Sequence, residues 1–163
     1  MLGHPTETEE DIRGIAELSN KIAATFFDTV PKEKRVNGRV QIVTSTSFFV
    51  PKPFTPFQWA PQCTKEEFVE KAYLTRKAIS EQLNQKSIKY NWHEADVSVL
   101  EGVLARGDRK LSQVLLYVYN KGCFYDAGVS ISTTMSGWKL LKPVVWTRIS
   151  IPTENGLWTR SCP

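Results

Sequence analysis

Three prolines that follow a strand-like run constrain the fold of this chain more than any other feature. The run Val40–Val50 is rich in β-branched and aromatic residues, which favour strands, and it leads directly into Pro51-Lys52-Pro53-Phe54-Thr55-Pro56-Phe57-Gln58-Trp59. Proline fixes φ and lacks a backbone N–H, so the chain must leave the sheet here as a stiff extended segment. In α/β folds, ligands bind at the carboxyl ends of strands. The segment therefore supplies candidate ligand-binding residues: Lys52, Phe54, Gln58 and Trp59.

The length and composition favour a single globular domain in a reducing compartment. A chain of 163 residues can bury a core of its own. It holds no run of about 18 apolar residues, so no membrane span is expected, and Met1–Pro5 has no signal-peptide character. The three cysteines Cys63, Cys123 and Cys162 have neither a disulfide pattern nor metal-ligand spacing. We therefore expect a cytoplasmic protein.

The positive charge of the chain is concentrated in its last quarter. The net charge is +4, and residues 128–163 alone contribute +3. The first 127 residues are close to neutral at +1. The overall basicity is therefore a poor argument for nucleic-acid binding.

The first half of the chain predicts a helix followed by a strand. Thr8 is a suitable N-cap, and Asp11 stands at the third helical position. Apolar residues then recur at helical spacing and predict one buried face: Ile12, Ile15, Leu18, Ile22 and Phe26. A helix that leads into the strand Val40–Val50 is typical of parallel α/β folds.

Capping patterns predict the elements after the proline segment. Thr64 and Glu67 form a capping box that opens a helix reaching about Gln85. Residues 88–92 are expected as a short strand or an extended segment. Ser98 and Glu101 form a second capping box, which predicts a helix over 99–106. A last helix, Leu111–Asn120, is expected to begin after Asp108 and to end near Gly122.

Two further clusters are candidates for chemistry, each with a structural alternative. His93, Glu94 and Asp96 are suited to a general base or a metal site, or to capping a helix. Arg106-Gly107-Asp108-Arg109-Lys110 is suited to phosphate binding, or to a turn between helices. His4 is a further residue that can approach a ligand. No glycine-rich phosphate loop or nucleophile elbow is present, so residue chemistry alone supplies no catalytic centre.

Three segments, taken in order, resemble one family. They are Gly3-His4-Pro5-Thr6-Glu7-Thr8-Glu9-Glu10-Asp11-Ile12, Phe49-Val50-Pro51-Lys52-Pro53-Phe54-Thr55-Pro56-Phe57-Gln58-Trp59 and Ser98-Val99-Leu100-Glu101-Gly102-Val103-Leu104-Ala105-Arg106-Gly107-Asp108-Arg109. Residues 1–127 resemble the C-terminal half of radical S-adenosylmethionine proteins, in the uncharacterised bacterial group that carries an upstream cobalamin-binding-type domain. The sequence departs from the family pattern at His4, where an apolar residue is usual, and at Phe54, where His is frequent.

The resemblance implies an α/β fold, the C-terminal part of a partial (β/α) barrel followed by a small helical region. Residues 1–60 would be the last helix and strand unit of the barrel with its proline-rich exit, and residues 61–127 the helical region. Gly3 and Glu7 would lie on the S-adenosylmethionine side. The substrate-side candidates would be Lys52, Phe54, Gln58, Trp59, His93 and Arg106.

The resemblance also implies an iron–sulfur enzyme that is incomplete in this chain. In the family, a Cys-x3-Cys-x2-Cys loop holds a 4Fe–4S cluster that reductively cleaves S-adenosylmethionine, and this loop is missing from the sequence. We therefore expect no cofactor and no catalysis from this chain alone. The parent enzyme would use the cluster, S-adenosylmethionine and, as a further candidate, cobalamin. The expected partners are an unknown substrate and the missing N-terminal half of the barrel.

Residues 128–163 differ in composition from the rest of the chain. They hold five Ser, five Thr and three of the five Trp, but a single acidic residue. A small β extension is one interpretation. Reading suitable codons one base out of register gives a stop-free, acidic continuation that is similar to the family. We therefore predict a one-base deletion near the Ala127/Gly128 boundary.

A second functional hypothesis needs no enzyme. Aromatic residues interleaved with basic ones can stack on bases, so the chain is also a candidate RNA-binding or protein-interaction module. The residues concerned are Lys52, Phe54, Phe57, Trp59, Arg106 and Arg109.

Overall fold

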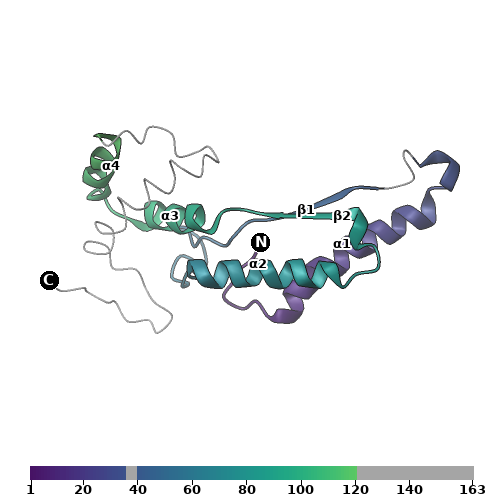
Figure 1. Ribbon diagram of the computed structural model, residues 1–163. Coiled ribbons are helices and arrows are strands. Elements are labelled where there is room, and N and C mark those ends of the chain that lie inside the picture. Colours follow the sequence, from purple (N-terminus) through teal and green to yellow (C-terminus); the bar gives the residue numbers. More distant parts are fainter. Residues whose placement is uncertain (36–39, 121–163) are drawn as a thin grey trace. The chain divides into compact units, whose positions relative to one another are not determined.

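The computed structural model describes residues 1–35 and 40–120, and the chain divides into two compact units. Of the described residues, the first unit combines 1–35, 40–49 and 63–95, and the second combines 50–62 and 96–120. The elements run in the order α1 (Glu9–Thr29), β1 (Ile42–Thr46), α2 (Lys65–Ser80), β2 (Ile88–Trp92), α3 (Ala95–Arg106) and α4 (Leu111–Asn120), with short 3₁₀ turns at Lys32–Lys34 and Gln85–Ser87 (Figure 1).

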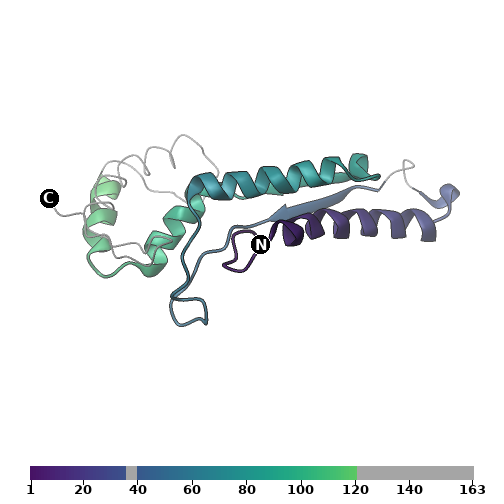
Figure 2. The same ribbon diagram turned by 90° about the horizontal axis from the view of Figure 1, so that it is seen from below.

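The first unit is a small parallel sheet with two helices on one side. β1 and β2 pair in parallel, with Ile42 opposite Ile88 and Thr46 opposite Trp92. Leu2 adds a single parallel bridge to Phe48 on the other side of β1. Helices α1 and α2 pack against each other and run along the strands (Figures 1 and 2). The side chains that point toward the helices are the less exposed ones in both strands.

The α/β character agrees with the sequence analysis, but the expected partial barrel is wrong for the described residues. Over residues 1–35 and 40–120, β1 has only β2 and the Leu2 bridge as neighbours, which makes an open two-stranded sheet. A barrel closes only when strands continue in both directions around the sheet. The strand expected over Val40–Val50 is also shorter, because regular pairing stops at Thr46 and only the Leu2 bridge continues it.

α1 begins where the sequence predicts, but it buries a different face. Thr8 Oγ1 accepts from the Asp11 N–H, and the Thr8 N–H donates to the Asp11 carboxylate at 2.9 Å. These two bonds confirm the cap. Leu18 and Ile22 were expected in the core, yet they are 61% and 50% exposed. The buried positions are Ile12 and three small residues, Ala16, Ser19 and Ala23, which let the helix approach the sheet closely.

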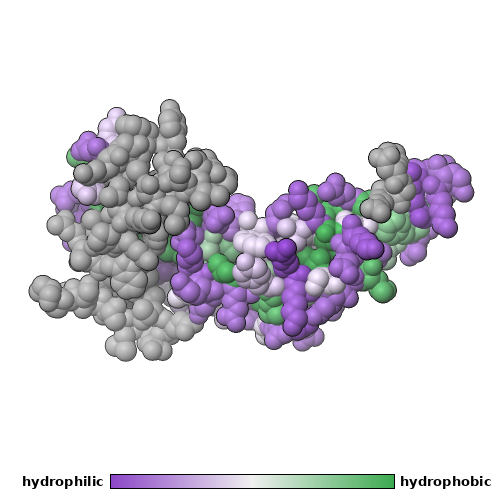
Figure 3. Space-filling model, viewed as in Figure 1, coloured by the Kyte–Doolittle hydropathy of each residue, from purple (hydrophilic) through white to green (hydrophobic). Residues whose placement is uncertain are grey.

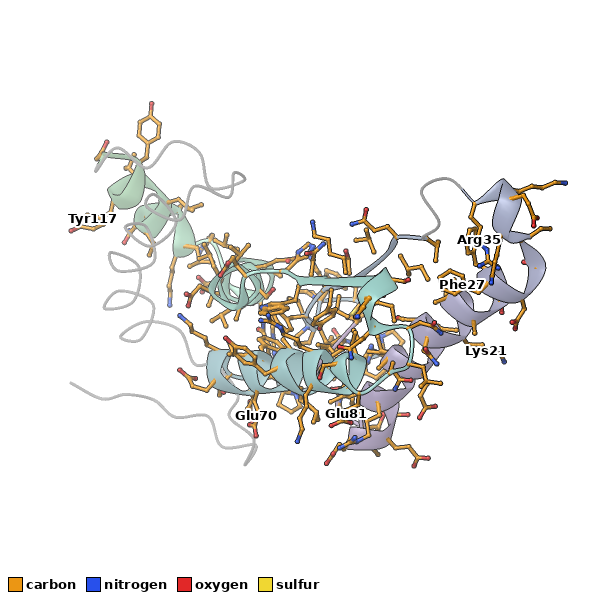
Figure 4. The ribbon with its side chains drawn as sticks, turned by 45° about the vertical axis from the view of Figure 1, so that its right-hand side comes forward. Lys21, Phe27, Arg35, Glu70, Glu81 and Tyr117 are labelled. Carbon is orange, nitrogen blue, oxygen red and sulfur yellow. The ribbon has the colours of Figure 1, made fainter. Side chains whose placement is uncertain are left out.

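The Arg35 side chain caps the C-terminus of α1. Arg35 donates to the carbonyl oxygens of Phe27 and Val30 at 2.6 and 2.8 Å, and its Cζ lies 5.1 Å from the centre of the Phe27 ring (Figure 4). Carbonyl groups at a helix C-terminus have no partner within the helix, and a cation there is favourable. Arg35 is therefore a helix cap, which accounts for one of the basic residues after α1.

α2 begins at the predicted capping box of Thr64 and Glu67 but ends at Ser80, five residues earlier than expected. Phe68, fully buried, stacks on Phe48 with 4.4 Å between ring centres. This aromatic pair joins the helix to the extended chain that leaves β1. The strand Ile88–Trp92 and the helix Leu111–Asn120 are confirmed with the predicted bounds.

The second capping box is wrong. α3 begins at Ala95, so Ser98 lies inside the helix and is buried. The Ser98 carbonyl accepts from Gln62 Nε2 at 2.8 Å. The helix end at Arg106 is confirmed.

Two expectations concern residues that the structure does not describe. They are the helix end near Gly122 and the frame-shift prediction for residues 128–163. Among the residues that are described, no helix is both long and apolar enough to cross a membrane.

Candidate functional site

Gly3 begins a tight turn at the carboxyl end of the Leu2 bridge. Its φ is +89°, a conformation that favours glycine. A Cβ atom at this position would lie 2.7 Å from Cε1 of Phe68, so there is no room for a side chain. The Gly3 N–H donates to both carboxylate oxygens of Glu7, at 3.0 and 3.2 Å. The structure therefore brings together the two residues that the resemblance assigns to the S-adenosylmethionine side.

Lys71 of α2 completes this turn. Its Nζ lies 2.9 Å from Glu7 Oε2, and the Glu7 and Lys71 side chains are 6% and 25% exposed. Burial works against the charge of Lys71, but the hydrogen bond and negative charge of Glu7 outweigh it, and the pKa of Lys71 is raised. We call Gly3, Glu7 and Lys71 the turn clamp. Because the Glu7 carboxylate is engaged on both sides within the clamp, its role here is to shape the turn.

Two neighbours support the clamp. The Cys63 thiol lies 3.7 Å from the Gly3 carbonyl oxygen, to which it donates. The His4 ring lies 4.7 Å from the Phe49 ring, tilted by 31°. His4 therefore packs against an aromatic ring. This leaves Pro5 and Thr6 as the exposed residues of the turn.

Among residues 1–35, 40–49 and 63–95, no helix covers the second face of the sheet. Val43 and Ser45 of β1 are exposed there, and their partners in register are Lys89 and Asn91 of β2. Parallel sheets are normally covered on both faces. The exposed face is polar apart from Val43, and the turn clamp lies beyond its carboxyl end.

The proline segment belongs to the second unit, where its polar side chains hold the segment itself. Lys52 forms an ion pair with Glu101 of α3. Gln58 Oε1 accepts from the Phe54 N–H at 3.3 Å, and Phe54 has a φ of +61°, rare for a residue with a side chain. The rings of Phe54 and Trp59 are 99% and 76% exposed.

The segment Arg106–Lys110 of the second unit makes local contacts. Arg106 donates to the Ala60 carbonyl oxygen at 3.3 Å, and burial lowers its pKa. Asp108 accepts from the Lys110 N–H, which agrees with the turn interpretation of residues 106–110. The phosphate-binding interpretation gains no support from this geometry.

The His93, Glu94 and Asp96 cluster does not assemble a metal centre. The His93 side chain is exposed, and its backbone N–H donates to the Thr46 carbonyl in continuation of the sheet. Across residues 1–35 and 40–120, no group of three or more His, Cys, Asp or Glu side chains is placed to hold a metal ion. Cys63 is the one cysteine within these ranges, and it is not in a disulfide. These described residues therefore do not fit a 4Fe–4S cluster.

The sequence analysis missed Lys71, the partner that buries Glu7. The two residues are 64 positions apart, and nothing in the pattern of α2 distinguishes Lys71 from the other lysines of that helix. The parallel connection between β1 and β2 is the signal that places the first half of α2 beside the Gly3 turn.

Comparison with known proteins gives one similarity. The chain is 33% identical over 120 residues to the uncharacterised protein MJ0966 of Methanocaldococcus jannaschii. The aligned part is 74% of this chain but 23% of that protein, so the chain spans about a quarter of its relative's length. No family model matches the chain, and no solved structure matches it.

Proposed function

We propose that this chain is a portion of a radical S-adenosylmethionine protein and that residues 3–7 form one side of the S-adenosylmethionine pocket. The observation that supports this proposal is the turn clamp, a preformed turn at the carboxyl end of a parallel strand. Ligands bind at this end of parallel sheets. The exposed polar face of β1 and β2 lies next to it and is the surface on which a substrate would be held.

The chain's own residues would position a ligand without reducing it. When bound elsewhere in the parent, the cluster would supply the electron that cleaves S-adenosylmethionine. Gly3 lets the backbone approach a ligand closely, the Glu7–Lys71 pair keeps the turn in one conformation, and Thr6 presents a hydroxyl to the solvent side. We propose that catalysis needs cluster ligands from another part of the parent protein.

A titration of the isotope-labelled chain with S-adenosylhomocysteine tests this role. We expect amide shifts concentrated at residues 3–7. Glu7→Gln retains an acceptor for the Gly3 N–H but removes the ion pair, and it should weaken binding by about tenfold. Gln62→Ala in the second unit is the matched control and should leave binding unchanged. The absence of amide shifts at millimolar ligand would contradict the proposal.

Anaerobic reconstitution with iron and sulfide tests whether the cluster ligands come from another part of the parent protein. We expect the chain alone to develop no iron–sulfur absorbance, because a 4Fe–4S cluster needs three or four cysteine ligands. A cluster assembled on this chain alone would show that the missing loop is dispensable and would refute the fragment interpretation.

The RNA-binding alternative rests on one observation, the exposed rings of Phe54 and Trp59. It is weakened because Lys52 is paired with Glu101 and Arg106 with the Ala60 carbonyl, which leaves less free positive charge for phosphates. Fluorescence anisotropy with single-stranded RNA at low salt distinguishes the two functions. Binding that is lost in the Phe54→Ser/Trp59→Ser variant would favour the alternative.

A further inference from the structure

The two sides of the small sheet end in different ways. On the side of Leu2, the Gly3 N–H bonds to Glu7 and the Gly3 carbonyl accepts from Cys63. Side chains therefore satisfy the backbone groups that would continue the sheet there. On the other side, β2 is the last strand, and its outer edge has no such covering among residues 1–35 and 40–120.

The register shows which backbone groups point outward. The His93 N–H bonds to the Thr46 carbonyl, so the alternation of the ladder turns the backbone groups of Lys89 and Asn91 toward β1. The N–H and C=O groups of Tyr90 and Trp92 then point away from β1. Unpaired groups of this kind are a template for another strand.

A groove lies along this edge. It has a volume of about 590 Å³ and runs between β2 and α2. Its lining is Arg76, Ile79 and Ser80 from α2, Ile88, Tyr90, Asn91 and Trp92 from β2, and Gln85 and Glu94. Figure 3, viewed as in Figure 1, shows hydrophobic and hydrophilic residues mixed over the part of the surface formed by the first unit. An open groove beside a free strand edge fits an extended chain better than a compact ligand.

We propose that the occupant is β2 of a second copy of this chain, paired antiparallel about Tyr90. A two-fold axis at Tyr90 places Ile88 opposite Trp92 of the second copy, so apolar side chains meet on the helix-covered face. On the other face, Lys89 lies opposite Asn91. The strand thus keeps its alternation of apolar and polar residues across the interface, as cross-strand pairing requires. The groove holds both a cation, Arg76, and an anion, Glu94, which suits a self-complementary surface better than a strongly charged partner.

Substitution of Asn91 by either charge tests this register. Lys89 and Asn91 form a non-hydrogen-bonded pair in the proposed dimer, the arrangement in which opposing side chains are closest. Asn91→Lys would set two lysines against each other at both ends of the interface, and Asn91→Glu would set a carboxylate against Lys89 twice. Because Asn91 is exposed, neither change disturbs the core. We expect the dimer dissociation constant to rise roughly three- to tenfold for Asn91→Lys and to fall by a similar factor for Asn91→Glu.

Sedimentation equilibrium of the full chain over a range of concentrations measures both effects. Ser45→Lys and Ser45→Glu are the matched controls, since Ser45 shares the exposed face but lies on β1, away from the edge. They should leave the dissociation constant unchanged. A chain that stays monomeric at millimolar concentration overturns the proposal. A dimer that responds equally to the Ser45 and Asn91 variants, or to neither, also overturns it, because the interface is then elsewhere.

Discussion

A few side chains stabilise local backbone conformations in this protein through contacts with residues far away in the sequence. Glu7 is the clearest case, since its nearly buried carboxylate accepts from the Gly3 N–H and pairs with Lys71. Removing one partner from a buried ion pair leaves the other charge without compensation, which is more costly than losing an exposed pair.

The turn clamp should therefore be sensitive to Lys71. We expect Lys71→Met to lower the free energy of unfolding by about 2–4 kcal/mol. Arg13→Met is the matched control, because Arg13 also pairs with a glutamate but both partners are exposed, and its cost should stay below about 1 kcal/mol. Urea denaturation measures both variants. If the two variants lose the same free energy of unfolding, the burial of Glu7 adds nothing to the stability that its ion pair provides.

The same pair predicts a dependence on alkaline pH. The pKa of Lys71 is raised in the folded protein, so the folded state binds this proton more tightly than the unfolded state. The stability it contributes is complete below the ordinary lysine value of 10.5 and is lost as the pH rises through the folded value. We expect the free energy of unfolding of the wild-type chain to fall more steeply above that pH than that of Lys71→Met. Parallel curves would contradict the pairing.

The backbone of Phe54 is strained, and its ring is not buried. A residue with a Cβ at a φ of +61° is disfavoured by about 1 kcal/mol, and its ring is almost fully exposed. We expect Phe54→Gly to leave the protein as stable or more stable by up to about 1 kcal/mol, as measured by thermal unfolding. A loss of more than that would mean that the ring makes a stabilising contact.

At the scale of helices and strands, the sequence predicts what depends on local interactions. The caps at Thr8 and Thr64, the strand 88–92 and the helix 111–120 all rest on signals within a few residues, and all are confirmed. The second capping box shows the limit of this approach. Glu101 stands three positions after Ser98, as a capping box requires, but the helix already begins at Ala95. Ser98 is buried inside the helix, and its carbonyl accepts from Gln62.

The buried face of α1 could not be predicted from apolar spacing alone. Leu18 and Ile22 continue the helical period of Ile12, yet the sheet lies against Ala16, Ser19 and Ala23. The reason is tertiary: Ser19 Oγ lies 2.8 Å from Thr44 Oγ1, a contact that only a small residue allows. The turn clamp escaped prediction for a similar reason, because its partners come from elements far apart in the chain.

α1 should respond to acid through its N-terminal cap. Hydrogen bonds from the Thr8 backbone and hydroxyl lower the pKa of Asp11. A lowered pKa stabilises the folded state above the ordinary value of 3.8, and this contribution is lost as the pH falls through the folded value. We expect Asp11→Asn to flatten the decline of helical circular dichroism below that pH, whereas Glu10→Gln, in the same turn, should change it less. An identical acid response in both variants would rule out the cap as its source.

At the scale of the whole molecule, the division into two units makes a distinct prediction. Phe68 lies in the first unit against Phe48, and Gln62 lies in the second, where it bonds to Ser98 and packs against Gly102. Phe68→Ala should cost about 3–5 kcal/mol through the cavity it leaves, and Gln62→Ala about 1 kcal/mol through the lost hydrogen bond to the Ser98 carbonyl. If each unit is stabilised by its own contacts, the two costs add in the double variant within about 0.5 kcal/mol.

Hydrogen exchange shows which elements each substitution destabilises. Phe68→Ala should expose amides of α2 and β1 while the protection of α3 stays unchanged. Loss of protection in α3 would mean that the units unfold together, and that the proline segment owes its conformation to the sheet as well as to the helix that its side chains bind.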